Sequence, residues 1–361
     1  MTFLFILLIL IILVFLFFQQ KQFGRLPSGD YAARIHQSSN YKNGKFQNES
    51  PTADLTEGAN LFKVMNEFIF HKSKRNKPAG ILPSVKTLIN IPPEDTLIWM
   101  GHSTYFMRID GKNILVDPVL SGNASPVSFT TKSFAGSDIY TTDDFPEIDF
   151  LFISHDHWDH LDYKTVKALI PKVKKVITGI GVQPHLLRWG FSPDTIIERD
   201  WNEEINLENG FSVTTAPARH FSGRLFKRNQ SIWSSFILKT PTMKIYLGGD
   251  SGFDSHFEKI GNKHGPFDFS ILECGQYNKH WKFIHMMPEQ VVKAAALLQS
   301  KNFMIVHWAK FSLSLHDWDE PIIRVVNESR KQKLNLVHPM IGEAVSLKNP
   351  QTGTEWWKNV R

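Results

Sequence analysis

The ten residues 153–162, ISHDHWDHLD, hold three histidines and three aspartates directly behind the apolar run IDFLF. His155 and His157 are two positions apart at the end of a predicted strand, so their imidazoles leave on the same side and can bind one ion. Asp159 and His160 follow at the turn into the next predicted helix, where they can face a second ion. Imidazole and carboxylate ligands suit zinc, or iron and manganese. A proton-transfer site and a polar surface turn are the alternatives, but this density of ligands behind a buried strand favours a metal site.

A site for two metals needs further ligands from other parts of the chain. His220 ends the predicted strand FSVTTAPA, Asp250 ends MKIYLGGD, and His307 ends FMIVH. Each is a weak signal alone, because a histidine at a strand end is commonly structural. Their shared position at the carboxyl ends of apolar strands predicts that they meet at one edge of the fold.

Short strands separated by glycine turns must position these residues. Three strands are predicted within 96–120, with the turn between the second and third at residues 110–112. The other predicted strands are 148–154, 175–179, 211–218, 234–240, 243–250, 268–275 and 303–308. Helices are predicted at 59–72, 164–172 and 288–300. The strand at 148–154, the helix after it and the next strand form a βαβ step, and the two similar halves indicate a layered α/β sandwich.

Composition is compatible with one large domain and extensions. The 361 residues are 42% hydrophobic, enough for a full core, and the net charge of +6 suits an anionic substrate or an anionic membrane surface. Cys274 is the single cysteine, which excludes an intramolecular disulfide and an all-cysteine zinc site, so metals must be held by histidines and carboxylates. Cys274 itself is interpreted as a small buried hydrophobe.

The N-terminus predicts a membrane segment. Residues 3–18 are apolar without a break, and sixteen residues span about 24 Å of helix. A cleaved signal peptide is the alternative, but no basic region precedes the run and no small-residue cleavage site follows it. We therefore expect an uncleaved anchor at 1–20, a polar tether and extension at 21–90, and a catalytic domain at 91–361. Basic residues follow the run, which predicts the catalytic domain on the cytoplasmic side of a bacterial inner membrane.

The ordered set His-x-His-x-Asp-His, His, Asp, His resembles the metallo-β-lactamase fold, an αββα sandwich, here preceded by the predicted transmembrane helix. The resemblance implies that His155, His157 and His220 bind a first metal, and that Asp159, His160 and His307 bind a second. Asp250 resembles the bridging carboxylate, and Asp117 resembles an aspartate that orients the site without binding metal. Two zinc ions are the expected cofactors, with iron or manganese as alternatives.

Longer strings are similar to the phospholipases D that hydrolyse N-acyl-phosphatidylethanolamine, over about residues 90 to 345. They are WMGHSTYFMRIDGKNILVDPVLSGNASP, ISHDHWDHLDYKTV, GGDSGF, IGNKHGPFD and IHMMPEQVVKA. FGRLPSG and NGKFQN resemble membrane-anchored bacterial relatives, whereas ECGQYNKHW is only loosely similar to the corresponding segment. The resemblance implies catalytic roles for Asp159, Asp250 and His285, with His285 near the metals either as a support for a metal ligand or as a substrate contact.

The implied reaction is attack of a hydroxide held between the metals on the phosphodiester, which releases N-acylethanolamine and phosphatidic acid. The expected partners are a phospholipid substrate and the membrane, with no nucleic acid, and the sequence leaves open whether the chain forms a homodimer. Two alternatives remain. One is another hydrolase of this fold, a lactonase or a phosphodiesterase for soluble substrates. The other is a metal-stabilised membrane scaffold without catalysis.

Overall fold

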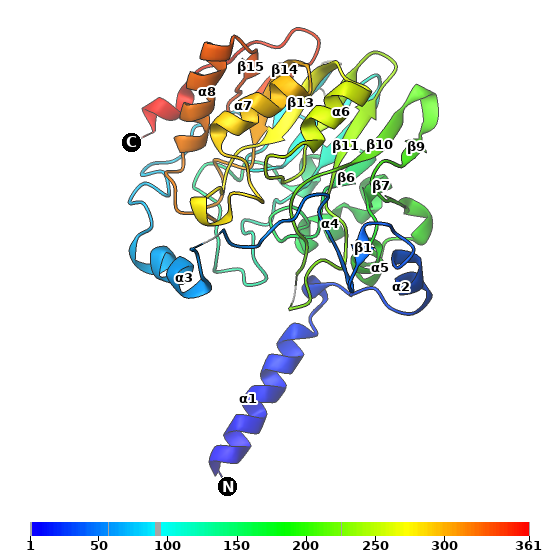
Figure 1. Ribbon diagram of the computed structural model, residues 1–361, viewed down its shortest axis with the longest axis vertical. Coiled ribbons are helices and arrows are strands. Elements are labelled where there is room, and N and C mark those ends of the chain that lie inside the picture. Colours follow the sequence, from blue (N-terminus) through cyan, green and yellow to red (C-terminus); the bar gives the residue numbers. More distant parts are fainter. Residues whose placement is uncertain (1, 57, 91–94, 225, 361) are drawn as a thin grey trace.

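The computed structural model describes residues 2–56, 58–90, 95–224 and 226–360. Two seven-stranded sheets pack face to face, and helices cover the outer face of each sheet (Figure 1). The predicted α/β sandwich of the metallo-β-lactamase type is therefore confirmed.

Each sheet is mixed, with antiparallel strands toward one edge and parallel strands toward the other. The first sheet has the spatial order β16 (Ala344–Ser346), β3 (Thr96–Trp99), β4 (Tyr105–Ile109), β5 (Lys112–Val116), β6 (Ile148–Ile153), β7 (Val173–Gly179), β8 (Ile196–Arg199). The second has the order β15 (Leu336–Val337), β14 (Ser300–Val306), β13 (Phe267–Glu273), β12 (Lys244–Leu247), β11 (Ser234–Lys239), β10 (Ser212–Pro217), β9 (Glu204–Asn206).

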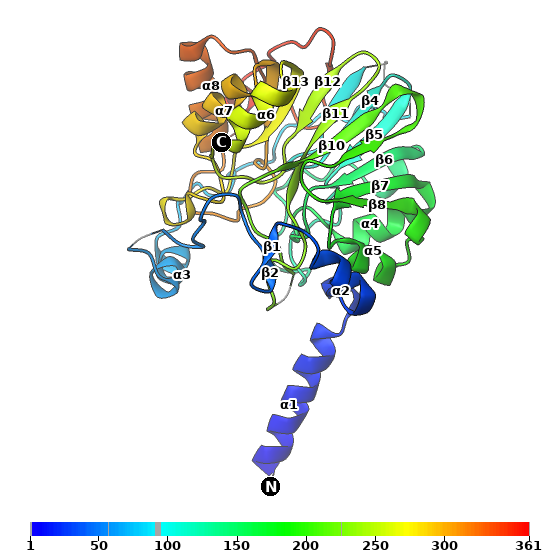
Figure 2. The same cartoon turned by 45° about the vertical axis from the view of Figure 1, so that its right-hand side comes forward.

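Two groups of helices form the outer layers (Figure 2). On the first sheet lie α4 (Tyr163–Leu169) and α5 (Gln183–Trp189), and on the second lie α6 (His256–His264), α7 (Pro288–Leu297) and α8 (Glu320–Gln332). Short 3-10 helices are η1 (Lys21–Phe23), η2 (Thr142–Asp144), η3 (Ile170–Lys172), η4 (Pro193–Thr195), η5 (Glu208–Gly210), η6 (Lys279–Trp281) and η7 (Trp356–Asn359). The sequence patterns predicted α4 and α7 but not α5, α6 or α8.

Local sequence explains several of the elements that lead to the sheet edge where the ligands lie. Asp110 and Gly111 join β4 to β5, and both have positive φ, the conformation that a two-residue hairpin turn requires. β6, α4 and β7 form the predicted βαβ step, with β6 and β7 parallel. Every residue of β6 is buried, because the second sheet covers one face and α4 with α5 covers the other.

The main core lies between the two sheets and under α6 to α8. Aromatic pairs cross it: the ring centroids of Phe152 and Phe236 are 5.2 Å apart, and those of Phe150 and Phe211 are 5.8 Å apart. Cys274 is fully buried in this core, where burial raises the pKa of its thiol well above the usual range. That environment agrees with its interpretation as a small hydrophobe.

Residues 21–90 contain more structure than a polar tether. They form α2 (Gly29–Ile35), the hairpin strands β1 (Tyr41–Lys42) and β2 (Lys45–Phe46), and α3 (Leu61–Phe70). Phe23, Ile35 and Phe46 are buried against the sandwich. α3 matches the helix predicted at 59–72, and the side chain of Asn60 caps it by accepting the Lys63 backbone N–H at 2.8 Å. The boundaries at residues 20 and 90 stay a prediction.

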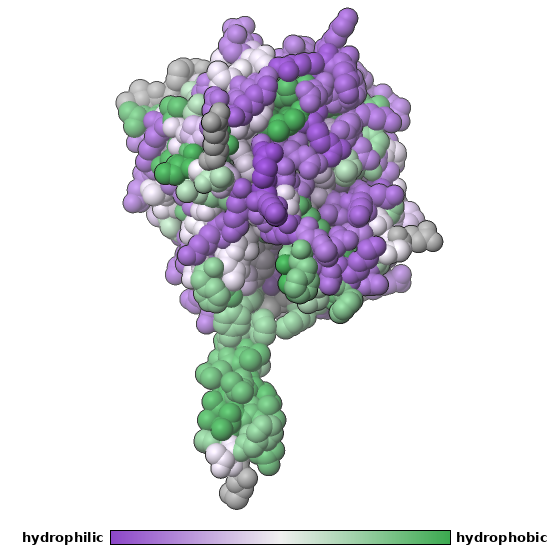
Figure 3. All heavy atoms as spheres, turned by 90° about the vertical axis from the view of Figure 1, so that its left-hand side faces the viewer, coloured by the Kyte–Doolittle hydropathy of each residue, from purple (hydrophilic) through white to green (hydrophobic). Residues whose placement is uncertain are grey.

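The prediction of an N-terminal transmembrane helix is wrong. Its residues form α1 (Thr2–Phe18), which extends from the body of the molecule and is apolar over the visible surface (Figure 3). In the described parts of the chain, however, no helix combines the length and apolar character that a membrane crossing requires. The 17 residues of α1 span about 26 Å, against about 30 Å of hydrocarbon. The predicted single-pass anchor, and with it the location in a bacterial inner membrane with a cytoplasmic catalytic domain, is overturned.

Candidate metal centre

A first group of three imidazoles lies where β6 and β10 end. His155 Nε2 is 2.9 Å from His157 Nδ1, and His220 Nε2 is 3.2 Å from the same atom. His155 and His157 follow β6, and His220 follows β10 in the opposite sheet. The nitrogen atoms lie within 4.8 Å of one another, so one ion can contact all three.

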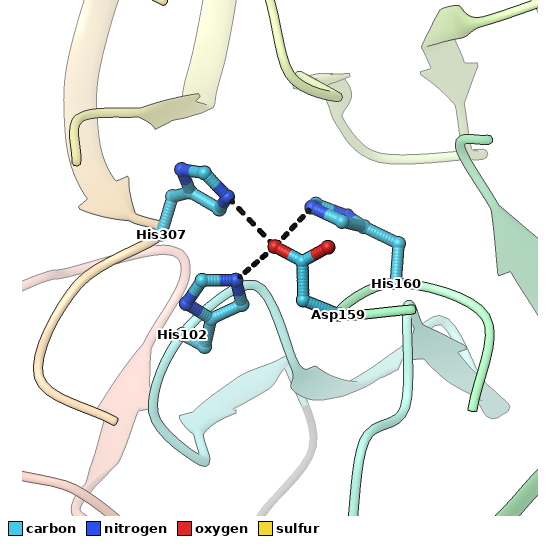
Figure 4. A group of neighbouring side chains, drawn as sticks. All are labelled: His102, Asp159, His160 and His307. Carbon is cyan, nitrogen blue, oxygen red and sulfur yellow. Dashed lines mark hydrogen bonds and ion pairs between the residues drawn. The ribbon is translucent and has the colours of Figure 1, made fainter. Parts of the chain in front are cut away.

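A second group surrounds the carboxylate of Asp159 (Figure 4). Asp159 Oδ2 is 3.6 Å from His160 Nε2 and 3.3 Å from His307 Nε2. It is also 2.9 Å from Nε2 of His102, in the turn that joins β3 to β4. Figure 4 shows the three imidazoles pointing toward this carboxylate from separate segments of the chain.

Asp250 lies between the two groups. Its Oδ2 atom is 3.1 Å from His160 Nε2 and 3.2 Å from His307 Nε2, and it is 3.9 Å and 3.7 Å from the Nε2 atoms of His155 and His220. One carboxylate oxygen thus contacts imidazoles of both groups. This is the position that a ligand shared by two metals requires.

Outer hydrogen bonds fix the orientation of these imidazoles. The Asp117 carboxylate accepts from His160 Nδ1 at 2.8 Å and from the Ser154 hydroxyl at 2.6 Å. The Ile284 carbonyl accepts from His220 Nδ1 at 2.8 Å. Partners of this kind fix the tautomer of a metal-binding histidine and orient its ring. Asp117 therefore contacts a predicted ligand from behind, as the sequence comparison implied.

Burial and neighbouring charges give the first group protonation states that suit metal binding. Burial holds the pKa of His155 and His220 well below the usual range and lowers that of His157 to about 4. Burial alone would raise the pKa of Asp159 and Asp250, but the neighbouring imidazoles, His160 first, outweigh it and keep both carboxylates ionised. Neutral imidazole and ionised carboxylate are the forms that bind metals.

The unsatisfied polar atoms fit two metal ions. Buried His160 Nε2 and Asp250 Oδ1 have no hydrogen-bond partner among the described residues, and His160 Nε2 is held only by ion-pair contacts with the Asp250 and Asp159 carboxylates. Polar atoms buried without partners are costly unless a ligand satisfies them. Nitrogen and carboxylate donors without a thiolate suit zinc, manganese and iron.

A cleft opens over the centre, with a volume of about 470 Å³. His285 lines this cleft, with its ring centroid 5.0 Å from that of His220 and 5.1 Å from that of His307. The apolar wall consists of Leu55, Leu61, Phe68, Phe221, Trp281, Ile284 and Leu313. Arg228 also lines the cleft, and its guanidinium lies 3.8 Å from the centre of the Phe221 ring.

The structure brings together every site residue predicted from the sequence, and their roles as ligands stay a prediction. Two further residues were missed. His102 stands after an apolar strand in the string GHST, a signal that could have been weighed with the other strand-end histidines. Glu273 ends β13, and its Oε2 lies 3.7 Å from His285 Nδ1 and 3.8 Å from His307 Nδ1.

Residues 112–308, which include all the predicted metal ligands but not His102, match the family model of the β-lactamase superfamily domain. The chain belongs to the β-lactamase superfamily. It is a metal-dependent hydrolase of the metallo-β-lactamase fold, related to the phospholipases D that hydrolyse N-acyl-phosphatidylethanolamine.

Proteins similar to this chain include two of similar sequence and one solved structure of similar fold. An uncharacterised protein of Mycobacterium tuberculosis is 34% identical over 328 residues, covering 89% of this chain and 88% of the relative. N-acyl-phosphatidylethanolamine-hydrolyzing phospholipase D 1 of Caenorhabditis elegans is 30% identical over 317 residues, covering 80% of this chain and 86% of the relative. The structure of Igni18, a metallo hydrolase from Ignicoccus hospitalis, aligns with a TM-score of 0.55 at 20% identity, covering 69% of this chain and 97% of that chain. That likeness concerns the fold alone.

Proposed function

We propose that the protein is a dinuclear zinc phosphodiesterase of phospholipase D type. Its substrates would be N-acyl-phosphatidylethanolamine-like phospholipids, and its products N-acylethanolamine and phosphatidic acid. The observation that carries the proposal is the position of Asp250, whose Oδ2 contacts imidazoles of both ligand groups. The relative from Caenorhabditis elegans bears the name of an enzyme for this substrate.

The residues of the centre would have separate roles in binding the metals and the substrate. His155, His157 and His220 would hold one metal, and Asp159, His160 and His307 the other, with Asp250 shared between them. When bound, two metals of this kind activate a water molecule and neutralise negative charge on the phosphoryl oxygens. His285, beside both His220 and His307, faces the cleft and would contact the bound phosphodiester.

The wall of the cleft supports a substrate with acyl chains. Leu61 and Phe68 of α3 line the same cleft as the predicted metal ligands, and Phe68 stacks on Trp281 with ring centroids 5.9 Å apart. The ion pair between Glu67 and His280, at 2.9 Å, ties α3 to the body. Further apolar side chains along α3 are exposed: Phe62, Met65, Ile69 and Phe70. An apolar surface that continues out of the cleft suits hydrocarbon too large for the cleft itself.

A substrate panel tests the proposal. Zinc-loaded full-length protein is assayed against N-acyl-phosphatidylethanolamine in mixed micelles, a soluble aryl phosphodiester and a set of lactones, with Asp268→Ala as a control at the opposite end of β13 from the centre. We expect turnover of the lipid to phosphatidic acid by both proteins. Turnover of lactones without any lipid product would assign the protein to the lactonases instead. Bound metal without turnover of any substrate would support the non-catalytic scaffold.

A further inference from the structure

His102 is held beside the metal centre by its own backbone. It lies in the turn between β3 and β4, is completely buried and has a φ of 51°. Its N–H donates to the Trp308 carbonyl at 2.9 Å, and its carbonyl accepts from the His307 N–H at 3.0 Å. The indole N–H of Trp99 also donates to the His102 carbonyl, at 2.8 Å. The turn is thus locked onto the segment that carries the predicted ligand His307.

The side chain of His102 reaches the second ligand group from the side opposite His160. Its Nε2 is 2.9 Å from Asp159 Oδ2, a distance typical of a charge-assisted hydrogen bond. The ring centroids of His102 and His307 are 4.3 Å apart. Because ionised Asp159 only accepts hydrogen bonds, His102 satisfies it when the imidazole proton is on Nε2.

The outer nitrogen distinguishes His102 from four of the five predicted histidine ligands; the fifth, His157, turns Nδ1 inward and likewise leaves its outer Nε2 without a partner among the described residues. Four histidines point Nε2 into the centre and anchor Nδ1 on an oxygen: His155 on Ser154, His160 on Asp117, His220 on Ile284 and His307 on Gly275. His102 also points Nε2 inward, but its Nδ1 has no hydrogen-bond partner among the described residues. Metal-binding imidazoles almost always donate from the other ring nitrogen. His102 lacks that arrangement, which favours a donor over a ligand.

We propose that His102 is a positioning residue: its Nε2–H donates to Asp159 Oδ2 and orients this carboxylate toward the second metal. The proposal rests on the pair of metals in the proposed function, but not on the proposed substrate. Loss of the donor removes one fixed contact of Asp159 and frees its carboxylate to rotate. We therefore expect weaker binding at the second metal and unchanged binding at the first.

Metal titration without substrate tests this role. Metal-free full-length protein is titrated with zinc in competition with a chromophoric chelator, for wild type and for His102→Ala, His102→Asn and His102→Gln. Alanine has no donor, asparagine is too short to reach Asp159, and glutamine keeps an N–H that can reach it. His264→Ala, at the end of α6, is the control. Circular dichroism of the metal-free proteins verifies that each variant is folded.

We expect alanine and asparagine to weaken one binding step by about 10- to 100-fold and to leave the other within about threefold. Glutamine should stay within about threefold of wild type in both steps, and its cobalt-loaded form should keep the wild-type visible spectrum because no ligand is lost. Wild-type affinities in the alanine variant would overturn the proposal. A glutamine variant as weak as alanine, with an altered cobalt spectrum, would also overturn it, because His102 would then be a ligand. Failure of the lipid assay would not affect these measurements.

Discussion

At the scale of single residues, the centre depends on carboxylates that each contact several imidazoles. Asp250 contacts both ligand groups, whereas Asp159 contacts only the second. Asp117 acts from behind through His160. Substitution of these three aspartates should therefore have different consequences for metal binding.

Asp250→Ala should reduce kcat more than about a hundredfold, equivalent to ~2.7 kcal/mol of transition-state stabilisation, because the contact shared by both groups is lost. The purified variant should also contain less zinc than wild type. Steady-state kinetics and elemental analysis measure the two effects, with Asp268→Ala as the folded control. A variant with wild-type activity and full metal content would refute the assignment of Asp250.

Metal binding should strengthen as the pH rises. Burial would lower the pKa of His160, but Asp250, Asp159 and Asp117 outweigh it and raise that pKa well above the usual range. A raised pKa means that His160 keeps its proton to higher pH, and this proton must leave before the imidazole can bind metal. Affinity at the second group should therefore fall as the pH is lowered through neutrality, and binding should release protons.

Calorimetric zinc titrations in buffers of different ionisation enthalpy measure the protons released. Equal affinities at about pH 6 and about pH 8, without proton release, would contradict this account of His160.

At the scale of elements, the carboxyl ends of strands from both sheets place the ligands, and α3 covers the cleft. The Glu67–His280 ion pair and the Phe68–Trp281 stack attach α3 to the body of the molecule, and Val64 is its one buried side chain among the described residues. Leu61 lines the cleft, although its side chain is 67% exposed. This helix should therefore influence substrate binding more than chemistry.

Leu61→Asp should raise KM for a long-chain N-acyl-phosphatidylethanolamine about tenfold, equivalent to ~1.4 kcal/mol, because a charge replaces apolar surface at the cleft. The rate on a soluble aryl phosphodiester should stay unchanged. Ile81→Asp is the matched control, since Ile81 is also exposed but does not line the cleft. Equal KM values for all three proteins would show that α3 does not contact the lipid.

At the scale of the whole molecule, the candidate metal centre draws its residues from both sheets. His155 and Asp159 come from the first sheet, and His220, Asp250 and His307 come from the second. Ligand binding across this junction stabilises the folded state relative to the unfolded chain.

Chelation should therefore lower the melting temperature. At free zinc about 100 times its Kd, binding contributes ~2.7 kcal/mol to the free energy of unfolding. Calorimetry before and after dialysis against a chelator, and again after zinc is restored, measures the change. The shift should be smaller for Asp250→Ala, and an unchanged melting temperature in wild type would be evidence against a centre that joins the sheets.

The predicted ligands could be found from the sequence because most of them lie within a few residues of the end of an apolar strand, and Asp159 with His160 follows in the turn after β6. His155 and His307 are examples: local pattern fixes the strand, and parallel pairing brings strand ends to one edge. His102 and Glu273 also end strands, but their importance depends on contacts that only the folded chain shows. The reciprocal hydrogen bonds between His102 and residues 307–308 join the two sheets, and no local sequence pattern predicts them.

The first 90 residues were predicted less accurately than the sandwich, because their structure depends on element length and on contacts that are distant in the sequence. Residues 3–18 are apolar, which suggested a membrane span. The helix that they form, α1, ends at Phe18 and is shorter than a membrane crossing requires. The polar composition of residues 21–90 likewise concealed buried anchors such as Phe23 and Phe46, whose contacts lie far away in the sequence.

Hydrolysis of N-acyl-phosphatidylethanolamine in water enriched in heavy oxygen tests the central claim most directly. If water attacks phosphorus at the metal centre, mass spectrometry should find one heavy oxygen in the phosphate of phosphatidic acid and none in the N-acylethanolamine. Heavy oxygen in the hydroxyl of the N-acylethanolamine, or in a released fatty acid, would contradict a phospholipase D reaction.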